Sequence, residues 1–177
     1  MNNPQAACIS TTNIGVISDT HGLLRPEAIE HLRGSDLIIH AGDIGSIEVI
    51  SELKKIAPLK AIRGNIDKGA WADHFADLEV VEVHGKYLYV LHNLNDLDLD
   101  PVAAGFDVVI CGHSHAAKIE TVDGVLYLNP GSAGPRRFKL PVTLATVSIT
   151  LSGVSAQVHE LPIENTPSAR ARRAKQG

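Results

Sequence analysis

The chain of 177 residues has few cysteines, few aromatic residues and no long apolar run. Two cysteines, Cys8 and Cys111, cannot build the disulfide framework of a small secreted protein, so we expect a reducing compartment. No apolar stretch approaches the ~20 residues that span a bilayer. Residues 1–7 are polar and lack the basic and apolar parts of a signal peptide. These features predict a cytoplasmic protein with no membrane partner.

Low aromatic content and an acidic balance argue against nucleic-acid binding. Aromatic residues make up 4 % of the chain, which is too few for a platform that stacks single-stranded bases. The net charge is −4, and four of the cations lie in the tail, at Arg170, Arg172, Arg173 and Lys175. Without these four cations the net charge of −4 becomes about −8 for the rest of the chain, which disfavours a phosphate backbone as partner. We therefore expect no dedicated nucleic-acid-binding surface.

The length suits one compact domain with a core of Val, Ile, Leu and Ala. We expect a flexible N-terminal segment over residues 1–12, a domain over 13–161 and a basic disordered tail over 162–177. A homo-oligomer is compatible with this organisation.

The first half of the domain alternates strands and helices. Its predicted elements are strands at 13–18, 36–40 and 59–62, with helices at 26–32 and about 46–56. This order implies an α/β fold with a parallel sheet covered by helices. The second half is mostly strands, with hairpin turns at His84-Gly85 and Asp123-Gly124 and a short helix around 101–104.

Metal-binding residue types follow the apolar strands. The candidates are Asp19, His21, Asp43, Asn65, His92, His113 and His115. In parallel sheets the carboxyl ends of the strands share one edge, so we expect these side chains to meet there. Carboxylate, imidazole and amide ligands together suit Mn²⁺, Fe²⁺, Co²⁺, Ni²⁺ or Zn²⁺, whereas four histidines disfavour Ca²⁺. Seven side chains exceed the needs of one ion and fit two if a carboxylate bridges them, for which Asp43 is the candidate.

Each residue also has a simpler interpretation. Asp19 or Asp43 alone could cap a following helix. Gly42, Gly64 and Gly112 could merely permit tight turns. The segment Asn129-Pro130-Gly131-Ser132 is typical of a turn. The joint pattern favours the metal site.

Five ordered blocks of this chain resemble the calcineurin-like metallophosphoesterase superfamily. They are Asp19-x-His21, Gly42-Asp43, Gly64-Asn65, His92 and Gly112-His113-x-His115. Within it, the small YfcE-type phosphodiesterases are the most similar branch, through Ile38 to Asp43, Arg63 to Asp67 and Asn129 to Ser132. The resemblance covers about residues 13–160. It implies a four-layer αββα sandwich of two mixed sheets flanked by helices.

The resemblance also implies a role for each residue. Asp19, His21 and His115 would hold one metal with Asp43, while Asn65, His92 and His113 would hold the second, also with Asp43. A hydroxide bridging the two ions would attack the phosphorus in line with the leaving group. Manganese is the first expectation for both ions.

Two departures from the family pattern bear on catalysis. Ile66 stands where many members have a histidine that serves the leaving oxygen, so Asp67 or metal-bound water is left as the proton donor. Arg63 could neutralise the substrate phosphate or form a structural ion pair. The fourth block is His92-Asn93-Leu94 rather than His-Gly-His, which alters the pocket wall after His92.

We therefore expect a metal-dependent phosphodiesterase that acts on a small-molecule or nucleotide ester, with Asp43, Asn65, Asp67 and Arg63 as catalytic residues. Segments 94–100 and 131–138 are the expected rims of its pocket, although the cations at 136–139 could simply be solvated. The alternatives are a protein-binding scaffold like the trafficking subunit Vps29, and a protein with two unequally filled metal sites. Retention of all seven ligand candidates favours the enzyme.

Overall fold

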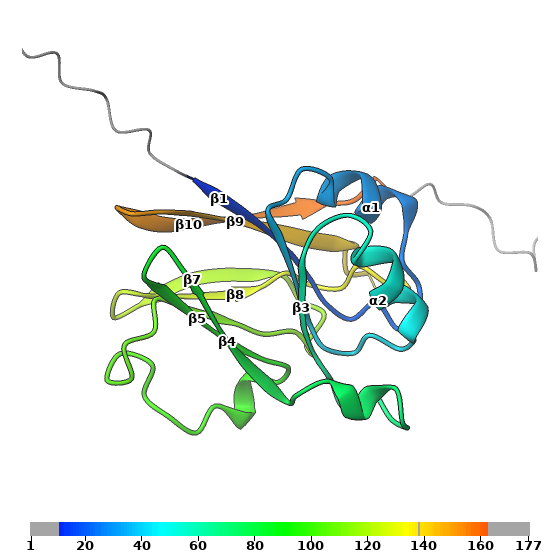
Figure 1. Ribbon diagram of the computed structural model, residues 1–177, viewed down its shortest axis with the longest axis horizontal. Coiled ribbons are helices and arrows are strands. Elements are labelled where there is room, and N and C mark those ends of the chain that lie inside the picture. Colours follow the sequence, from blue (N-terminus) through cyan, green and yellow to red (C-terminus); the bar gives the residue numbers. More distant parts are fainter. Residues whose placement is uncertain (1–10, 138, 163–177) are drawn as a thin grey trace, which may run out of the picture.

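In the computed structural model, residues 11–137 and 139–162 are described, and they form two stacked five-stranded sheets (Figure 1). The first sheet has the order β10 (Gly153–Glu160), β9 (Thr143–Thr150), β1 (Thr12–Ile17), β2 (Leu37–Ala41) and β3 (Leu59–Ile62). The second has the order β4 (Leu78–Val83), β5 (Lys86–Leu91), β6 (Val108–Ile110), β8 (Val125–Asn129) and β7 (Lys118–Val122). The two mixed sheets of the expected sandwich are confirmed.

Each sheet contains three adjacent parallel strands. Strands β1, β2 and β3 are parallel, with β9 and β10 added antiparallel beyond β1. In the second sheet β5, β6 and β8 are parallel, and β4 and β7 are antiparallel edge strands. The carboxyl ends of several parallel strands therefore meet at one edge of the sandwich, where ligands usually bind in such sheets.

Apolar residues fill three interfaces between four layers. The central core joins the facing sides of the sheets, through residues such as Val16, Ile39 and Ile110. Helices α1 (Pro26–Leu32) and α2 (Ile47–Leu53) pack on the outer face of the first sheet. The outer face of the second sheet is covered by Leu97, Leu99 and Phe106 from the segment after β5. This fourth layer consists of loop and the 3₁₀ helix η2 (Leu94–Asp96). A second 3₁₀ helix, η1 (Ala72–His74), follows β3.

The predicted helix at 101–104 is wrong. These residues form only hydrogen-bonded turns, because the segment that the Asp100 carboxylate caps is ended at once by Gly105, with φ +79° and backbone bonds from Gly105 to Val102 and from Phe106 to Pro101. Both predicted hairpins are present, with positive φ at His84-Gly85 and Asp123-Gly124, as a type I′ turn requires.

The two terminal segments expected to be flexible lie almost wholly outside the described residues, and β1 already begins at Thr12. None of the helices in the described part of the chain has the length and apolar character needed to cross a membrane.

Candidate metal centre

The loops after five strands converge on one edge of the sandwich and are tied together by backbone hydrogen bonds. The N–H of Asp19, after β1, donates to the Gly42 carbonyl over 3.0 Å, and the N–H of His21 donates to the Asp43 carbonyl over 3.0 Å. On the second sheet, the N–H of Gly112, after β6, donates to the His92 carbonyl over 2.9 Å. These bonds place the predicted ligands side by side.

Asp19, His21 and His115 form one group of possible metal ligands. The Nε2 atom of His115 lies 3.2 Å from Asp19 Oδ1 and 3.3 Å from His21 Nε2. Asp19 is fully buried, and Ser18 Oγ donates to its Oδ2 over 2.7 Å. That hydrogen bond fixes the carboxylate and leaves Oδ1 directed at the histidines.

A second group consists of Asp19, Asp43 and His92. Asp43 Oδ1 lies 3.2 Å from His92 Nε2, and Asp43 Oδ2 lies 3.8 Å from His21 Nε2. Asp43 thus faces histidines of both groups, as a bridging carboxylate would. The remaining two candidates adjoin this group, because His113 Nδ1 lies 3.0 Å from Asn65 Oδ1 and the His113 and His92 rings are 5.2 Å apart.

Buried lone pairs without a proton donor show that these residues fit metal ions. Asp19 Oδ1 and His92 Nε2 are buried and lack a hydrogen-bonding partner among the described residues. His92 Nδ1 lies 2.8 Å from the Ala41 carbonyl, which can only accept, so Nδ1 carries a proton and Nε2 is the ring nitrogen directed at Asp43. An unsatisfied buried polar group costs about 1–3 kcal/mol, which a bound cation would offset.

Burial sets most of the protonation states. It raises the pKa of Asp19 to about 6, against the opposing hydrogen bond from Ser18. Burial, together with the charge of Arg137, lowers the pKa of His115 to about 4, so the His115 imidazole is neutral at pH 7. For Asp43, burial is outweighed by the contacts with His92 and the Ile66 N–H, which lower its pKa. The carboxylate of Asp43 is therefore ionised and ready to bind a cation.

Two glycines allow the loops to approach closely. A Cβ atom at Gly64 would lie 2.2 Å from Asp43 Oδ1, and one at Gly112 would lie 2.0 Å from Ser18 Oγ. No side chain fits at either position without displacing a neighbour of the ligand set. These glycines therefore do more than permit turns.

Asp67 and Arg63 occupy different places from the ligands. The buried Asp67 carboxylate accepts hydrogen bonds from the N–H groups of Ile44, Gly45 and Gly64 at 3.0, 2.8 and 2.8 Å. Asp67 thus ties the loop after β2 to the loop after β3. The Arg63 guanidinium pairs with both oxygens of Asp77 at 2.5 and 2.9 Å.

The segment Asn129–Ser132 supports two ligand loops. Asn129 Nδ2 donates to the Gly112 carbonyl over 2.7 Å, and Ser132 Oγ donates to the Asp19 carbonyl over 2.9 Å. The segment does not form the expected turn: it runs from the end of β8 at Asn129 to an isolated bridge between Ser132 and Val142, and its side chains fix the backbone of both loops.

Arg137 is a residue of the site that its sequence context did not identify. Its Nη2 lies 3.5 Å from His21 Nε2, and it forms no ion pair with any residue that the structure describes. Its loop is held by Arg25 Nε, which donates to the Gly134 carbonyl over 3.1 Å. The available signal was its position just after Asn129–Ser132, in the stretch expected to form a pocket rim.

Comparisons with known proteins identify the class. Residues 13–152 match the model of the calcineurin-like phosphoesterase superfamily domain, so the chain belongs to that superfamily. It is 36 % identical over 131 residues to a probable metallophosphoesterase of Methanocaldococcus jannaschii. The aligned residues cover 69 % of this chain and 68 % of the relative. A phosphodiesterase of the same organism is 32 % identical over 142 residues, which cover 67 % of this chain and 82 % of the relative.

The fold also resembles a solved structure of vacuolar protein sorting 29 from Cryptosporidium parvum. The TM-score is 0.73 at 20 % identity, with 85 % of this chain and 92 % of that chain covered. At this identity the likeness concerns the fold alone. The family expected from the sequence is confirmed.

Proposed function

We propose that this chain is a phosphodiesterase that uses two divalent transition-metal ions, with manganese as the first choice. The observation that carries the proposal is the pair of candidate ligand groups sharing Asp19, because its Oδ1 and the nearby His92 Nε2 are buried without a hydrogen-bonding partner among the described residues. The phosphodiesterase name of one relative supports the reaction type. When bound, two such ions supply an activated water and neutralise charge on a phosphoryl group.

Each residue of the centre has a proposed part. Asp19, His21 and His115 hold one ion together with Asp43, whose ionised carboxylate faces both groups. His92 holds the second, oriented through its Nδ1 proton by the Ala41 carbonyl. Asn65 and His113, which contact each other at 3.0 Å, complete that set.

Arg137 and Asp67 have proposed parts outside the ligand set. The Arg137 guanidinium, placed beside His21 with no ion pair to a described residue, binds the phosphate oxygens of the substrate. Asp67, with its oxygens held by backbone N–H groups, positions the loops and does not donate a proton. Arg63 is a structural partner of Asp77.

Hydrolysis of bis-p-nitrophenyl phosphate and p-nitrophenyl phosphate across a panel of divalent metals tests the proposal. We expect metal-dependent turnover of the diester, two ions per chain by elemental analysis, and a loss of at least about 100-fold for Asp43→Ala. Glu82→Ala, which removes an exposed carboxylate on β4, is the matched control and should retain activity. A folded protein that binds two ions but does not hydrolyse the diester would contradict the phosphodiesterase assignment. A protein that hydrolyses the diester with one bound ion would contradict only the proposal of two ions.

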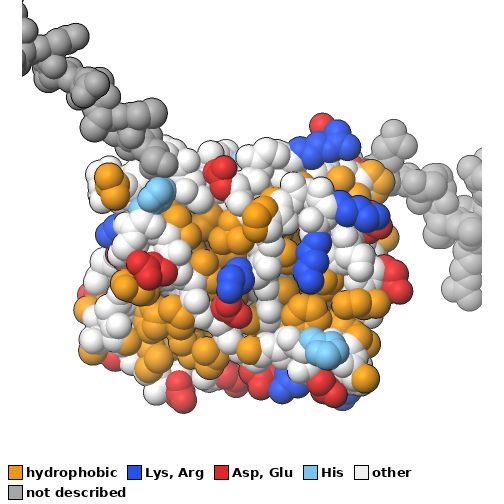
Figure 2. Space-filling view, viewed as in Figure 1, with side chains coloured by type: hydrophobic (Ala, Val, Ile, Leu, Met, Phe, Trp, Pro, Cys, Tyr) orange, Lys and Arg blue, Asp and Glu red, His pale blue; other side chains and the backbone are white. Residues whose placement is uncertain are grey.

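A second candidate function is a protein-binding module. It is favoured by the likeness to vacuolar protein sorting 29 and by exposed apolar side chains, Leu78 and Val80 on the edge strand β4 and Tyr87 on β5. Figure 2 shows apolar side chains gathered over the lower part of this face of the molecule. Exposed apolar groups on an edge strand are typical of contact surfaces. Absence of both metal and turnover in the folded wild type would favour this function.

A further inference from the structure

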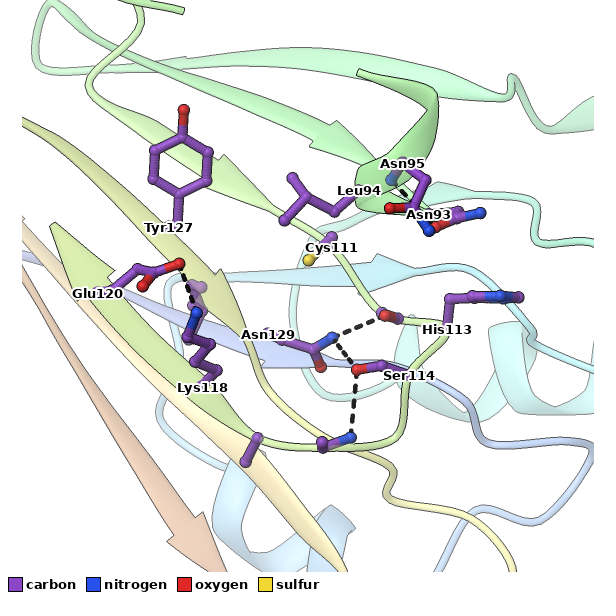
Figure 3. Close-up of a pocket in the computed structure, with 14 residues that line it drawn as sticks. Asn93, Leu94, Asn95, Cys111, His113, Ser114, Lys118, Glu120, Tyr127 and Asn129 are labelled. Carbon is purple, nitrogen blue, oxygen red and sulfur yellow. Dashed lines mark hydrogen bonds and ion pairs between the residues drawn. The ribbon is translucent and has the colours of Figure 1, made fainter. Parts of the chain in front are cut away.

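A cavity beside the metal centre lies between η2 and the segment 112–118 (Figure 3). Its volume is about 370 Å³, at the lower end of the range for pockets that hold a small organic group. Buried Cys111 and Leu128 line its inner part, while Leu94, Tyr127 and Ala116 contribute further lining. The lining is mainly apolar, so the cavity suits an uncharged group.

The cavity adjoins a second cavity at the metal centre. Asn93 and His113 line it and also line the neighbouring cavity, which contains Asn65 and His92. The N–H of His113 donates to Asp19 Oδ2 over 3.1 Å, which fixes the backbone of a residue that lines both cavities. In Figure 3 the His113 ring extends away from Cys111 and Asn129. A phosphate held at the metal centre would therefore have the apolar cavity beside it, on the far side of Asn93 and His113.

Polar groups lie at two sides of the apolar lining. Asn93 and Asn95 lie on one side, and the ion pair between Lys118 Nζ and Glu120 Oε1, at 2.7 Å, lies on the other (Figure 3). A flat ring with hydrogen-bond donors and acceptors at its edges matches this arrangement, because its faces can contact apolar side chains while its edges meet the amides. A small aliphatic alcohol would leave most of the cavity unfilled.

The residues that depart from the family pattern belong to this wall. Asn93 and Leu94, which follow His92 in place of Gly-His, both line the cavity. Leu94 is 39 % exposed at the opening, so its side chain is available to a ligand. The departure therefore affects the side of the site where an ester group would lie rather than the ligand atoms.

We infer that this cavity binds the ester group of the substrate and that this group is a nucleoside, whose base lies on the apolar lining. The inference rests on the proposed phosphodiesterase function. It assigns Leu94 and Ala116 as specificity-determining residues that do not touch the reacting phosphoryl group.

Binding of adenosine 5′-monophosphate and ribose 5-phosphate to the Mn²⁺-loaded full chain, measured by calorimetry, tests the inference. The two ligands share the phosphate and the ribose and differ by the base. We expect the nucleotide to bind more tightly by about tenfold or more, the range typical of stacking one base. Equal affinities in the wild type would overturn the inference.

Two variants block the cavity in different ways. Ala116→Phe fills it and Leu94→Asp places a charge at its opening, and both residues are exposed, so folding should survive. Each should bring the nucleotide to within about twofold of ribose 5-phosphate while leaving the affinity for ribose 5-phosphate unchanged. The matched controls are Ala103→Phe and Leu151→Asp, at exposed positions outside the cavity lining. A preference for the nucleotide that persists in both cavity variants would overturn the inference.

Failure of the cavity and failure of the proposed reaction are distinguishable. Diester turnover without nucleotide preference overturns the cavity assignment alone. Nucleotide preference that the cavity variants abolish, in a protein without turnover, overturns the phosphodiesterase assignment alone and leaves a nucleotide-binding cavity.

Discussion

Most candidate ligands adopt a backbone conformation that residues other than glycine rarely use. The five with positive φ, between 48° and 67°, are Asp19, His21, Asp43, His113 and His115. Each of these positive-φ conformations costs on the order of 1 kcal/mol of folding free energy and persists only where the surrounding structure holds the backbone. Here the hydrogen bonds between the strand-end loops hold the backbone. The candidate ligands are therefore held in place by the fold itself.

Close packing at Gly64 makes it the sharpest test of this preorganisation. In Gly64→Ala the new Cβ would meet Asp43 Oδ1 at 2.2 Å and the Asp43 backbone N at 2.3 Å, so we expect Asp43 to shift. Urea unfolding should show a loss of about 1–3 kcal/mol, typical of overpacking, with weaker Mn²⁺ binding by calorimetry. Gly153→Ala is the control, since nothing lies within 4 Å of its added Cβ. Unchanged metal affinity in Gly64→Ala would show that the approach of the two loops is not needed.

At the scale of the elements, Asp67 joins two loops that carry ligands. In Asp67→Asn the new amide group cannot accept the backbone N–H groups of Ile44, Gly45 and Gly64 as two carboxylate oxygens do. We expect a loss of about 1–3 kcal/mol in the free energy of unfolding and weaker metal binding. If Asp67 only positions the loops, the remaining activity at saturating metal keeps the pH profile of the wild type. Loss of one limb of that profile, with metal content unchanged, would instead identify Asp67 as the proton donor.

The sequence predicted the elements well where periodicity and strand ends coincide. The apolar strands before Asp19, Asp43 and Asn65 were placed to within a residue or two, because buried parallel strands leave a clear apolar pattern. The helix expected at 101–104 failed because Gly105, with φ +79°, ends the segment after a single turn, although Asp100 caps its start. A segment of one turn is too short to leave a periodic signal.

Site residues were predictable only where they lie at strand ends. The seven ligand candidates all lie together in the structure, although the metal-binding assignment itself stays a prediction. Arg137 and the cavity beside Leu94 could not be located from sequence, because their positions depend on contacts between distant loops, such as Arg25 with Gly134. Asp67 was assigned a catalytic part by its neighbourhood alone, and its partners appear only when the loops are folded together.

At the scale of the whole molecule, the candidate metal centre lies where the two sheets meet. Gly112 follows a strand of the second sheet, yet a Cβ there would touch Ser18, which follows a strand of the first. The ligand set therefore depends on the packing of one sheet on the other, through the shared apolar core. Loss of that packing would separate ligands from the two halves of the chain, so we expect metal binding to stabilise the folded state as a whole.

The stability of the metal-free molecule should depend on a histidine in that packed interior. His40 is fully buried, its Nε2 lies 2.9 Å from Thr20 Oγ1, and its Nδ1 has no hydrogen-bonding partner among the described residues. Burial, together with the nearby His92, lowers the pKa of His40 to about 3 from the 6.5 of an unfolded chain. Between these two values the unfolded chain holds a proton on His40 that the folded chain does not.

The contribution of His40 is therefore fully present above pH 6.5 and is lost as the pH falls toward 3. One extra proton on the unfolded chain makes the free energy of unfolding rise by about 1.4 kcal/mol per pH unit. The substitution His40→Gln should remove this dependence. Urea unfolding of the metal-free wild type and variant at several pH values between 6.5 and 4 gives the free energy of unfolding of each as a function of pH. The difference between the two slopes isolates His40, because Asp19 and His115 contribute equally to both proteins. Parallel stability curves for the two proteins would mean that His40 is protonated inside the fold, and that its surroundings accommodate the charge.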